Sequence, residues 1–279
     1  MHKQPYLTLN DGHRMPQLGF GVWQVSNDEV VEPVLNALET GYRSIDTAQG
    51  YGNEAGVGEA IRRSGVTRSD IFVTSKLRNK EHGFDSTLRA FDDTMAKLGL
   101  DVLNLFLIHW PVPSQDLYVE SWEALVRLRE EGRVKSIGVS NFLPEHVNRI
   151  LERTGVVPAI NQIEIHPLFQ QRGLRDFHKL KTIQLEAYSP LGSGAVLDNP
   201  AIAQIAQKHG KSPAQAILRW HVQEGVVVIP KSTHAERIAE NFDVFDFELD
   251  AEDMAAIRGL DDPAKGRTGA DPKEMAVLF

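Results

Sequence analysis

The chain has 279 residues, of which 42% are hydrophobic and 24% are charged. This composition is typical of a globular chain with a substantial core, and it excludes a disordered, collagen-like or disulfide-stapled miniature protein. The net charge of −8 argues against broad nucleic-acid binding and leaves room only for a local cationic pocket. The absence of cysteine excludes disulfides, thiolate metal sites and a cysteine nucleophile.

The N-terminal segment MHKQPYLTLNDGHRMP lacks the apolar core of a secretion signal, and no later run is long enough to span a bilayer. We therefore expect a soluble, cytoplasmic protein with no membrane partner. No sequence feature fixes the oligomeric state, for which we expect a monomer. The Asn-Asp-Gly sequence at residues 10–12 lies between two short extended pieces and favours a tight β-hairpin, which we expect to act as a small lid or plug.

Short apolar runs recur along the rest of the chain. Their nearly continuous apolar character is typical of parallel strands that are covered on both faces. The runs are LGFGV near residue 20, SID near 45, IFVTSK near 73, VLNLFLIH near 105, SIGVS near 138, INQIEIH near 162, IQLEAYS near 185 and VVVIPKS near 228.

Helical patterns separate these runs. Apolar residues at a 3.6-residue period precede Gly41, Gly99 and Gly132, and glycine is the residue that most often ends a helix. Strands and helices that alternate in this way predict a (β/α)8 TIM barrel, whereas a doubly wound sheet would show a GxGxxG turn that is absent here. No linker divides the chain, so we expect one domain over residues 1–279, with the aperiodic tail 261–279 forming a loop over the barrel mouth or a partly mobile end.

Four polar residues stand where strands of such a barrel end, which is where its active sites lie. Asp46 and Lys76 end the second and third strands, His109 ends the fourth, and Tyr51 follows Asp46 on the same loop. A phenol is a plausible acid for a carbonyl oxygen, and a nearby ammonium lowers its pKa. Asp46 would then hold Lys76 in its charged form, and His109 would orient the carbonyl.

Each of these residues alone has a simpler explanation. Asp46 and Lys76 can form a buried structural ion pair, and a single Tyr or His is more often part of a core or a surface. Their joint placement at successive strand ends favours catalysis. A metal centre is not indicated, because the histidines are scattered without paired ligand spacing.

The strings DTAQGYGNE, TSKL, LIHWP, IGVSNF, NQIEIHP and IPKS together resemble the aldo-keto reductase family, in order along almost the whole chain. SPAQAILRWH, ENFDVFDFEL and the GRTGADP tail are most similar to its bacterial 2,5-diketo-D-gluconate reductases. The resemblance implies Tyr51 as general acid, Lys76 and Asp46 as its tuning pair, His109 as the donor that orients the substrate, and NADPH as the hydride source.

Cofactor and substrate residues follow from the same comparison. Amide and hydroxyl groups can hydrogen-bond a carboxamide, an aromatic face can stack on nicotinamide, and a glycine-containing loop lets amides approach a pyrophosphate, although turns and helix caps use the same residue types. The expected cofactor residues are Ser140, Asn141, Gln162, Tyr188, Ser189, Leu191, Gly192, Ser193, Lys231, Ser232, Thr233, Arg237 and Asn241; the expected substrate residues are Trp23, Tyr51, His109 and Trp110.

Lys231 and Arg237 are six residues apart after the last strand and can clamp a 2′-phosphate, which favours NADP over NAD. Arg78 stands where the family most often has Trp, and it either receives an anionic substrate or points into solvent. Two other functions stay open: an NADP-binding, redox-sensing regulatory subunit with little catalytic role, and a barrel isomerase or lyase that uses Lys76 as a Schiff base.

Overall fold

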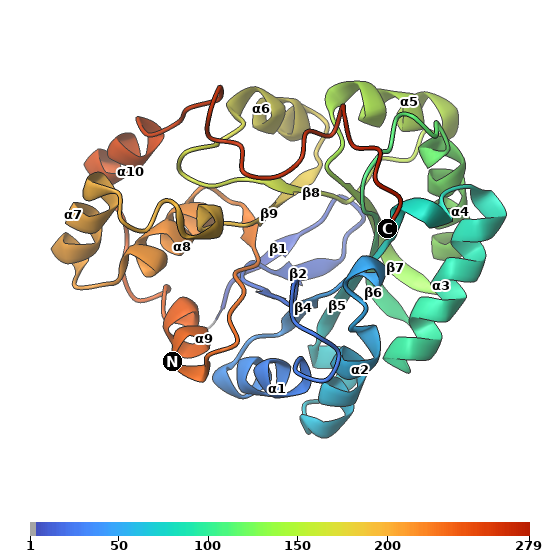
Figure 1. The fold of residues 1–279 in the computed structure, drawn as a ribbon, viewed down its shortest axis with the longest axis horizontal. Helices are drawn as coiled ribbons and strands as arrows, with labels where there is room; N and C mark the ends of the chain where they lie inside the picture. Colours follow the sequence, from blue (N-terminus) through green and yellow to red (C-terminus); the bar gives the residue numbers. More distant parts are fainter. Residues whose placement is uncertain (1–3) are drawn as a thin grey trace.

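The computed structural model describes residues 4–279, so the first three residues of the segment examined for a secretion signal lie outside it. Within this range the predicted barrel is confirmed (Figure 1). The parallel strands adjoin one another in the order in which they occur along the chain: β3 (Phe20–Gly21), β4 (Ser44–Asp46), β5 (Phe72–Leu77), β6 (Leu103–Ile108), β7 (Val134–Ser140), β8 (Ile160–Glu164), β9 (Gln184–Tyr188) and β10 (Val227–Val228).

The barrel closes between its first and last strands. Leu18, just before β3, forms a parallel bridge with Val228, and the Gly19 amide donates to the Val228 carbonyl at 2.8 Å. In the middle of the sheet, all six residues of β5 and all six of β6 are buried. Apolar runs without alternation therefore correspond to strands with one face in the barrel and the other under helices.

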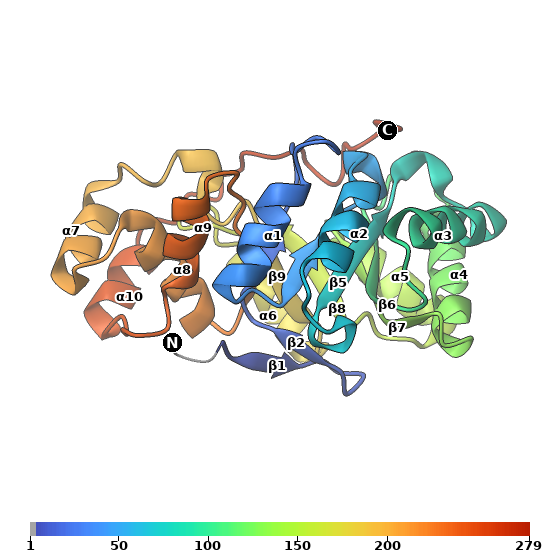
Figure 2. The same ribbon diagram turned by 90° about the horizontal axis from the view of Figure 1, so that it is seen from below.

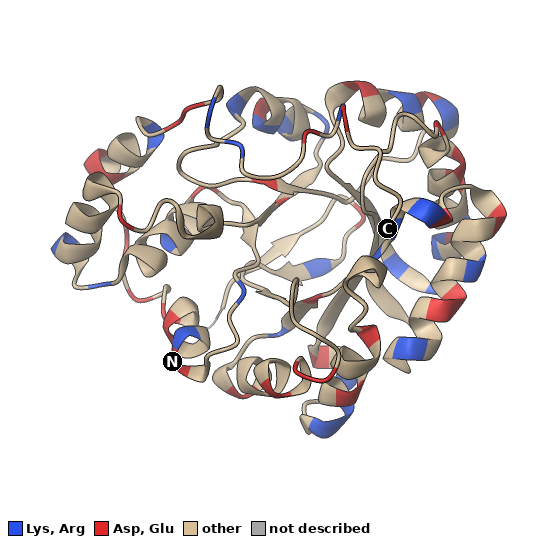
Figure 3. Cartoon of the chain, viewed as in Figure 1, with Lys and Arg blue, Asp and Glu red and all other residues tan. Residues whose placement is uncertain are grey.

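Helices cover the outside of the barrel, and Figure 3 shows that most charged residues lie on them. The regular alternation ends after β9, since two helices precede β10 and two more follow it. The helices are α1 (Val31–Thr40), α2 (Glu54–Arg63), α3 (Phe84–Leu98), α4 (Tyr118–Glu130), α5 (Pro144–Thr154), α6 (Arg172–Leu180), α7 (Pro200–His209), α8 (Pro213–Gln223), α9 (Ala235–Phe242) and α10 (Ala251–Arg258).

The predicted hairpin is formed by β1 (Tyr6–Thr8) and β2 (Arg14–Pro16), which pair in antiparallel register. It closes the end of the barrel opposite the C-terminus (Figure 2). Met15 is fully buried there, in a cluster with Phe72 and Ile160, the first residues of β5 and β8. Of the two expected roles, plug or lid, the hairpin is a plug, because it covers the amino ends of the strands.

The tail after α10 crosses the other end of the barrel without regular structure (Figure 1). The Asp262 amide donates to the Leu168 carbonyl at 2.9 Å, and Asn79 Nδ2 donates to the Val277 carbonyl at 2.7 Å. The tail is thus the predicted loop over the barrel mouth. Among the described residues, no helix has the length and apolar character that a membrane span requires.

Candidate active site

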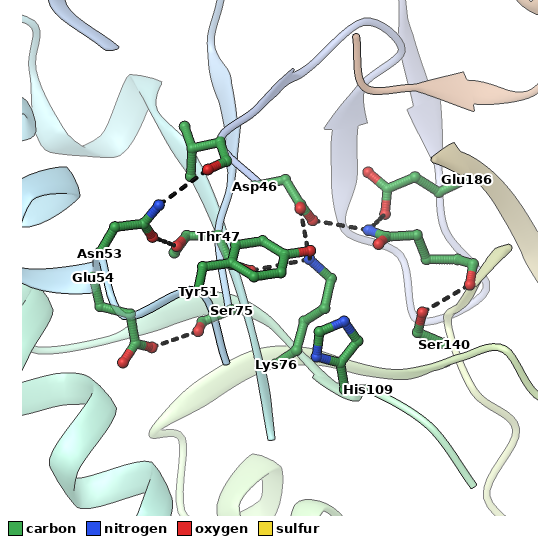
Figure 4. A network of polar contacts seen from close by, with 12 residues as sticks. Asp46, Thr47, Tyr51, Asn53, Glu54, Ser75, Lys76, His109, Ser140 and Glu186 are labelled. Carbon is green, nitrogen blue, oxygen red and sulfur yellow. Dashed lines mark hydrogen bonds and ion pairs between the residues drawn. The ribbon is translucent and has the colours of Figure 1, made fainter. Parts of the chain in front are cut away.

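Asp46, Lys76 and Tyr51 meet inside the mouth of the barrel (Figure 4). Lys76 Nζ lies 2.5 Å from Asp46 Oδ1 and 3.3 Å from the Tyr51 hydroxyl, and it also donates to the Thr47 carbonyl at 3.0 Å. These three acceptors take up the three protons of an ammonium group. Lys76 is completely buried, so its position and charge are fixed by these contacts.

Burial and the neighbouring charges have opposite effects on the pKa values of Lys76 and Tyr51. Burial lowers the pKa of Lys76, but the Asp46 carboxylate and Tyr51 outweigh burial, and the pKa is raised overall. Burial raises the pKa of Tyr51, whereas Lys76 lowers it and Asp46 raises it; the net direction is upward. Lys76 therefore lowers the pKa of the phenol, as expected, but desolvation is the larger effect and sets the upward net direction.

His109 stands beside this group at the end of β6, and its ring lies 5.7 Å from that of Tyr51, edge to face. Burial, the Lys76 charge and His82 hold the pKa of His109 well below its usual value. The imidazole is thus neutral at physiological pH. A neutral ring carries one N–H, which it can donate to a ligand oxygen.

A cavity of about 770 Å³ opens above these residues. Its walls combine polar groups from the strand ends with aromatic rings and tail residues. Asp46, Tyr51 and His109 border it, while Lys76 lies behind them. The other predicted residues that line it are Trp23, Trp110, Ser140, Asn141, Gln162, Tyr188, Ser189, Leu191, Ser193, Lys231 and Arg237.

Polar groups in the deep part of the cavity hold one another in place. Asn141 Nδ2 donates to the His109 carbonyl at 3.0 Å, and its Oδ1 accepts from the Tyr188 hydroxyl at 2.9 Å. Ser140 donates its hydroxyl to the Gln162 carbonyl at 2.8 Å. Asn141 has a φ of 62°, a conformation that Asn tolerates better than most residues. The Ser-Asn pair thus joins β6, β7, β8 and β9.

Four expected cofactor residues do not line the cavity: Gly192, Ser232, Thr233 and Asn241. The Gly192 amide donates to the Ser189 carbonyl at 2.8 Å, so it closes a turn and does not face the cavity as an anion donor. Ser232 Oγ accepts from the His234 amide at 3.1 Å just before α9, so it serves the start of this helix. Lys231 and Arg237 are exposed at the rim.

Arg78 does not reach the cavity. Its guanidinium donates to Glu81 Oε1 at 2.7 Å, three residues along the chain. An anionic substrate therefore gains no contact from it in this conformation, and the solvent-facing alternative fits the geometry better.

Two further parts of the site were not among the residues expected to form it. Tail residues line the cavity, namely Thr268, Gly269, Ala270, Met275 and Phe279. The Phe279 ring lies 5.4 Å from that of His109, and a Cβ at Gly50 would come within 2.7 Å of it. Glu164, at the end of β8, holds the tail by accepting from the Thr268 and Gly269 amides at 2.6 and 2.9 Å. An acidic strand-end residue and a glycine-containing tail are the only sequence signals.

The comparisons with known proteins agree with this geometry. Residues 17–262 match the model of the Aldo/keto reductase family. The chain is 52% identical to an aldo-keto reductase of Mycolicibacterium smegmatis over 96% of this chain and 97% of the relative. It is 50% identical to the methylglyoxal reductase DkgA of Escherichia coli, again over 96% and 97% of the two chains.

Solved structures also match along almost the whole chain. A variant of Gox0644 in complex with NADPH matches with a TM-score of 0.95 at 52% identity, covering 98% of this chain and 99% of that chain. The Bombyx mori aldo-keto reductase in complex with NADP has a TM-score of 0.91 at 36% identity, with 98% of both chains covered. Family match, sequence identity and barrel geometry extend over nearly all of the chain, which therefore belongs to the aldo/keto reductase family.

Proposed function

We propose that this protein reduces small aldehydes or ketones to alcohols with NADPH and that Tyr51 is the general acid. The observation that carries the proposal is the contact sequence Asp46–Lys76–Tyr51 beside a neutral His109 at the base of an open cavity. A phenol, a fixed ammonium and a neutral N–H donor are the groups needed to protonate and orient a carbonyl oxygen.

The cofactor is NADP(H), and the cavity suits it at both ends. Near Tyr51, the Asn141 and Gln162 amides and the Ser140 hydroxyl border the cavity and match a carboxamide, and the Tyr188 ring offers a face for stacking. At the rim, Lys231 and Arg237 supply positive charge in an otherwise acidic protein. Such a pair suits a phosphate group more than a neutral ribose hydroxyl. Relatives of known structure bind NADPH or NADP.

The chemistry divides among the residues as follows. NADPH, when bound, supplies the hydride that adds to the carbonyl carbon. His109 donates a hydrogen bond to the carbonyl oxygen and orients it toward Tyr51. Tyr51 gives its proton to that oxygen, and Lys76 stabilises the phenolate that remains. Asp46 keeps Lys76 charged and in place through the 2.5 Å contact.

The substrate class follows from the walls of the cavity. Trp23, Trp110 and Phe279 give it apolar surfaces around His109, and Arg78 is paired with Glu81. These walls favour a small carbonyl compound with limited charge over a strongly anionic one. Methylglyoxal, the substrate after which the relative DkgA is named, fits this class, and 2,5-diketo-D-gluconate is the anionic alternative.

The other candidate functions gain less support. A Schiff-base lysine must be accessible and uncharged during attack, whereas Lys76 is completely buried and its pKa is raised by Asp46 and Tyr51 against the effect of burial. A purely regulatory subunit has no need for the aligned acid, ammonium and imidazole.

The test is Tyr51→Phe, assayed by loss of NADPH absorbance with methylglyoxal and with 2,5-diketo-D-gluconate. Loss of one general acid removes about 10²- to 10⁴-fold in rate, while NADPH affinity measured by fluorescence titration should stay close to that of the wild type. Tyr42→Phe is the matched control, because Tyr42 is a buried tyrosine whose hydroxyl donates to the Ile238 carbonyl, and neither residue lines the cavity. A Tyr51→Phe enzyme that keeps half of its turnover would refute the acid role.

A further inference from the structure

Glu186 is a second buried carboxyl group in the barrel, and the proposed mechanism does not use it. It lies in β9, is completely buried, and stands in register between Gln162 of β8 and Val227 of β10. A carboxyl group inside a barrel costs free energy unless it is bonded or uncharged. The buried Glu186 carboxyl group must therefore be hydrogen-bonded, protonated or both.

Gln162 connects Glu186 to the catalytic group by hydrogen bonds to both carboxyl groups. Gln162 Nε2 donates to Asp46 Oδ2 at 2.8 Å and to Glu186 Oε2 at 2.9 Å. The two protons of one amide nitrogen thus bridge two carboxyl groups. Asp46 in turn contacts Lys76 through its other oxygen, and Lys76 contacts the Tyr51 hydroxyl, so four contacts connect Glu186 to that hydroxyl.

The charges around Glu186 do not balance if every group is ionised. Asp46 from β4 and Lys76 from β5 are the charged groups that face it, with Tyr51 beyond them, and its register partners Gln162 and Val227 are neutral. Two carboxylates would then share a single ammonium. Glu186 Oε1 is also buried without a hydrogen-bond partner among the described residues, so an ionised Glu186 would leave one oxygen unsolvated.

We propose that Glu186 is a positioning residue for the carbonyl reduction: it is uncharged at neutral pH and, when it ionises in alkaline solution, its charge keeps the proton on Tyr51. This inference rests on the proposed function, since it concerns the acid in that reaction. Burial and the Asp46 carboxylate raise the pKa of Glu186 to about 8, against the Gln162 hydrogen bond and Lys76, which lower it. The charge that then appears raises the pKa of both Tyr51 and Lys76.

The expected consequence is a wider pH range for reduction. Tyr51 acts as an acid only while it is a phenol, so its ionisation sets the alkaline limb of kcat/KM. A unit charge in an interior with an effective dielectric constant of about 20 moves a neighbouring pKa by on the order of one unit. Glu186 thus delays the loss of activity in the pH region where Tyr51 would otherwise begin to lose its proton.

The experiment is the pH profile of kcat/KM for Glu186→Gln with NADPH and methylglyoxal. Gln replaces an uncharged side chain of the same shape, so activity at pH 7 should be nearly unchanged, and the alkaline limb should move down by about one pH unit. Glu186→Asp, which restores an ionisable group, should move the limb back toward the wild type. A wild-type alkaline limb in Glu186→Gln would overturn the proposal.

Glu54→Gln is the matched control. Glu54 is also buried, accepts from Ser75 Oγ at 2.6 Å, and has a raised pKa because of burial, but Lys97 and Arg78 are the charges that act on it. The alkaline limb of kcat/KM in the Glu54→Gln variant should therefore equal that of the wild type. An equal shift in Glu54→Gln and Glu186→Gln would mean that any buried carboxyl has this effect, and would also overturn the proposal.

Three further outcomes can be distinguished. If Glu186→Gln does not fold, ¹³C titration of glutamate carboxyls in the Glu54→Gln protein with NADPH bound takes its place, and the absence of a glutamate that titrates above pH 7 would contradict the inference. If Tyr51→Phe retains activity, the proposed function fails, whatever the Glu186 result. If Tyr51→Phe is inactive and Glu186→Gln has the wild-type profile, only the role of Glu186 fails.

Discussion

Glu164→Gln should release the tail from the barrel mouth. Four donors converge on the Glu164 carboxylate: the Thr268 amide and hydroxyl, both at 2.6 Å, the Gly269 amide at 2.9 Å and His166 Nε2 at 3.0 Å. Glu164 is only 1% exposed, so water replaces none of these contacts. They lower its pKa to about 2, although burial by itself raises it.

The size of the effect follows from these contacts. Gln keeps one oxygen for Thr268 but turns an N–H donor toward the Gly269 amide, so one charge-assisted hydrogen bond is lost and the remaining ones weaken. A hydrogen bond to a charged group contributes about 1.5–3 kcal/mol and a neutral one about 0.5–1.5 kcal/mol. The substitution should therefore reduce the free energy that holds the tail on the barrel by about 2–3 kcal/mol, and the tail should open roughly 30- to 150-fold more often.

Amide hydrogen exchange at Thr268 and Gly269 measures this opening directly. Both amides should lose roughly 30- to 150-fold of protection in Glu164→Gln, and the KM for the carbonyl substrate should rise, because Thr268, Met275 and Phe279 line the cavity. Glu274→Gln, which removes an exposed charge from the same tail, is the control. Unchanged protection at both amides would refute the reasoning.

The same contact has a defined pH dependence. The pKa of Glu164 in the folded protein, about 2, lies below the ordinary glutamate value of 4.5. The contact therefore contributes its full stability above about pH 4.5, and this contribution falls as pH decreases toward 2. In the wild type, the protection of the Thr268 and Gly269 amides against hydrogen exchange should persist at neutral pH and decline only in acid.

Three further predictions follow from the site. Lys76→Met should be about as damaging as Tyr51→Phe, and the double variant scarcely worse, because residues that act as a unit are non-additive; multiplicative losses in steady-state rates would contradict this. Arg237→Ala should weaken NADPH by about ten- to a hundredfold and NADH far less, as measured by fluorescence titration, and equal losses would remove Arg237 from the 2′-phosphate site. Phe279→Ala should raise kcat/KM for bulkier aldehydes relative to methylglyoxal, because the ring that packs against His109 is removed; an unchanged ratio would show that Phe279 does not limit substrate size.

The barrel was predictable because its signals are local. Each strand is a run of consecutive apolar residues, and the run from Val102 to His109 contains both the buried strand and the polar residue at its end. Parallel strands in a barrel bring their carboxyl ends to one edge, so the sequence alone is sufficient to group Asp46, Lys76 and His109.

Other parts of the site depend on contacts that no local pattern encodes. The tail could be expected over the mouth, but only the folded chain brings Phe279 against His109, more than 160 residues earlier. Gly192 has the composition of an anion-binding turn, yet its amide is used by Ser189. Glu186 looks like a polar interruption in IQLEAYS, and its meaning depends on the register that sets it beside Gln162.

The pKa of Tyr51 shows why residue identity alone is insufficient. From the sequence, the Lys76 charge predicts a lowered pKa, but desolvation is the larger effect and raises it. A general acid must hold its proton at neutral pH and still release it in the transition state. Burial and Asp46 serve the first need, while the Lys76 contact at 3.3 Å serves the second by stabilising the phenolate. The acid role proposed for Tyr51 thus depends on the opposition between these effects, which arises only when the strands bring the groups together in a buried interior.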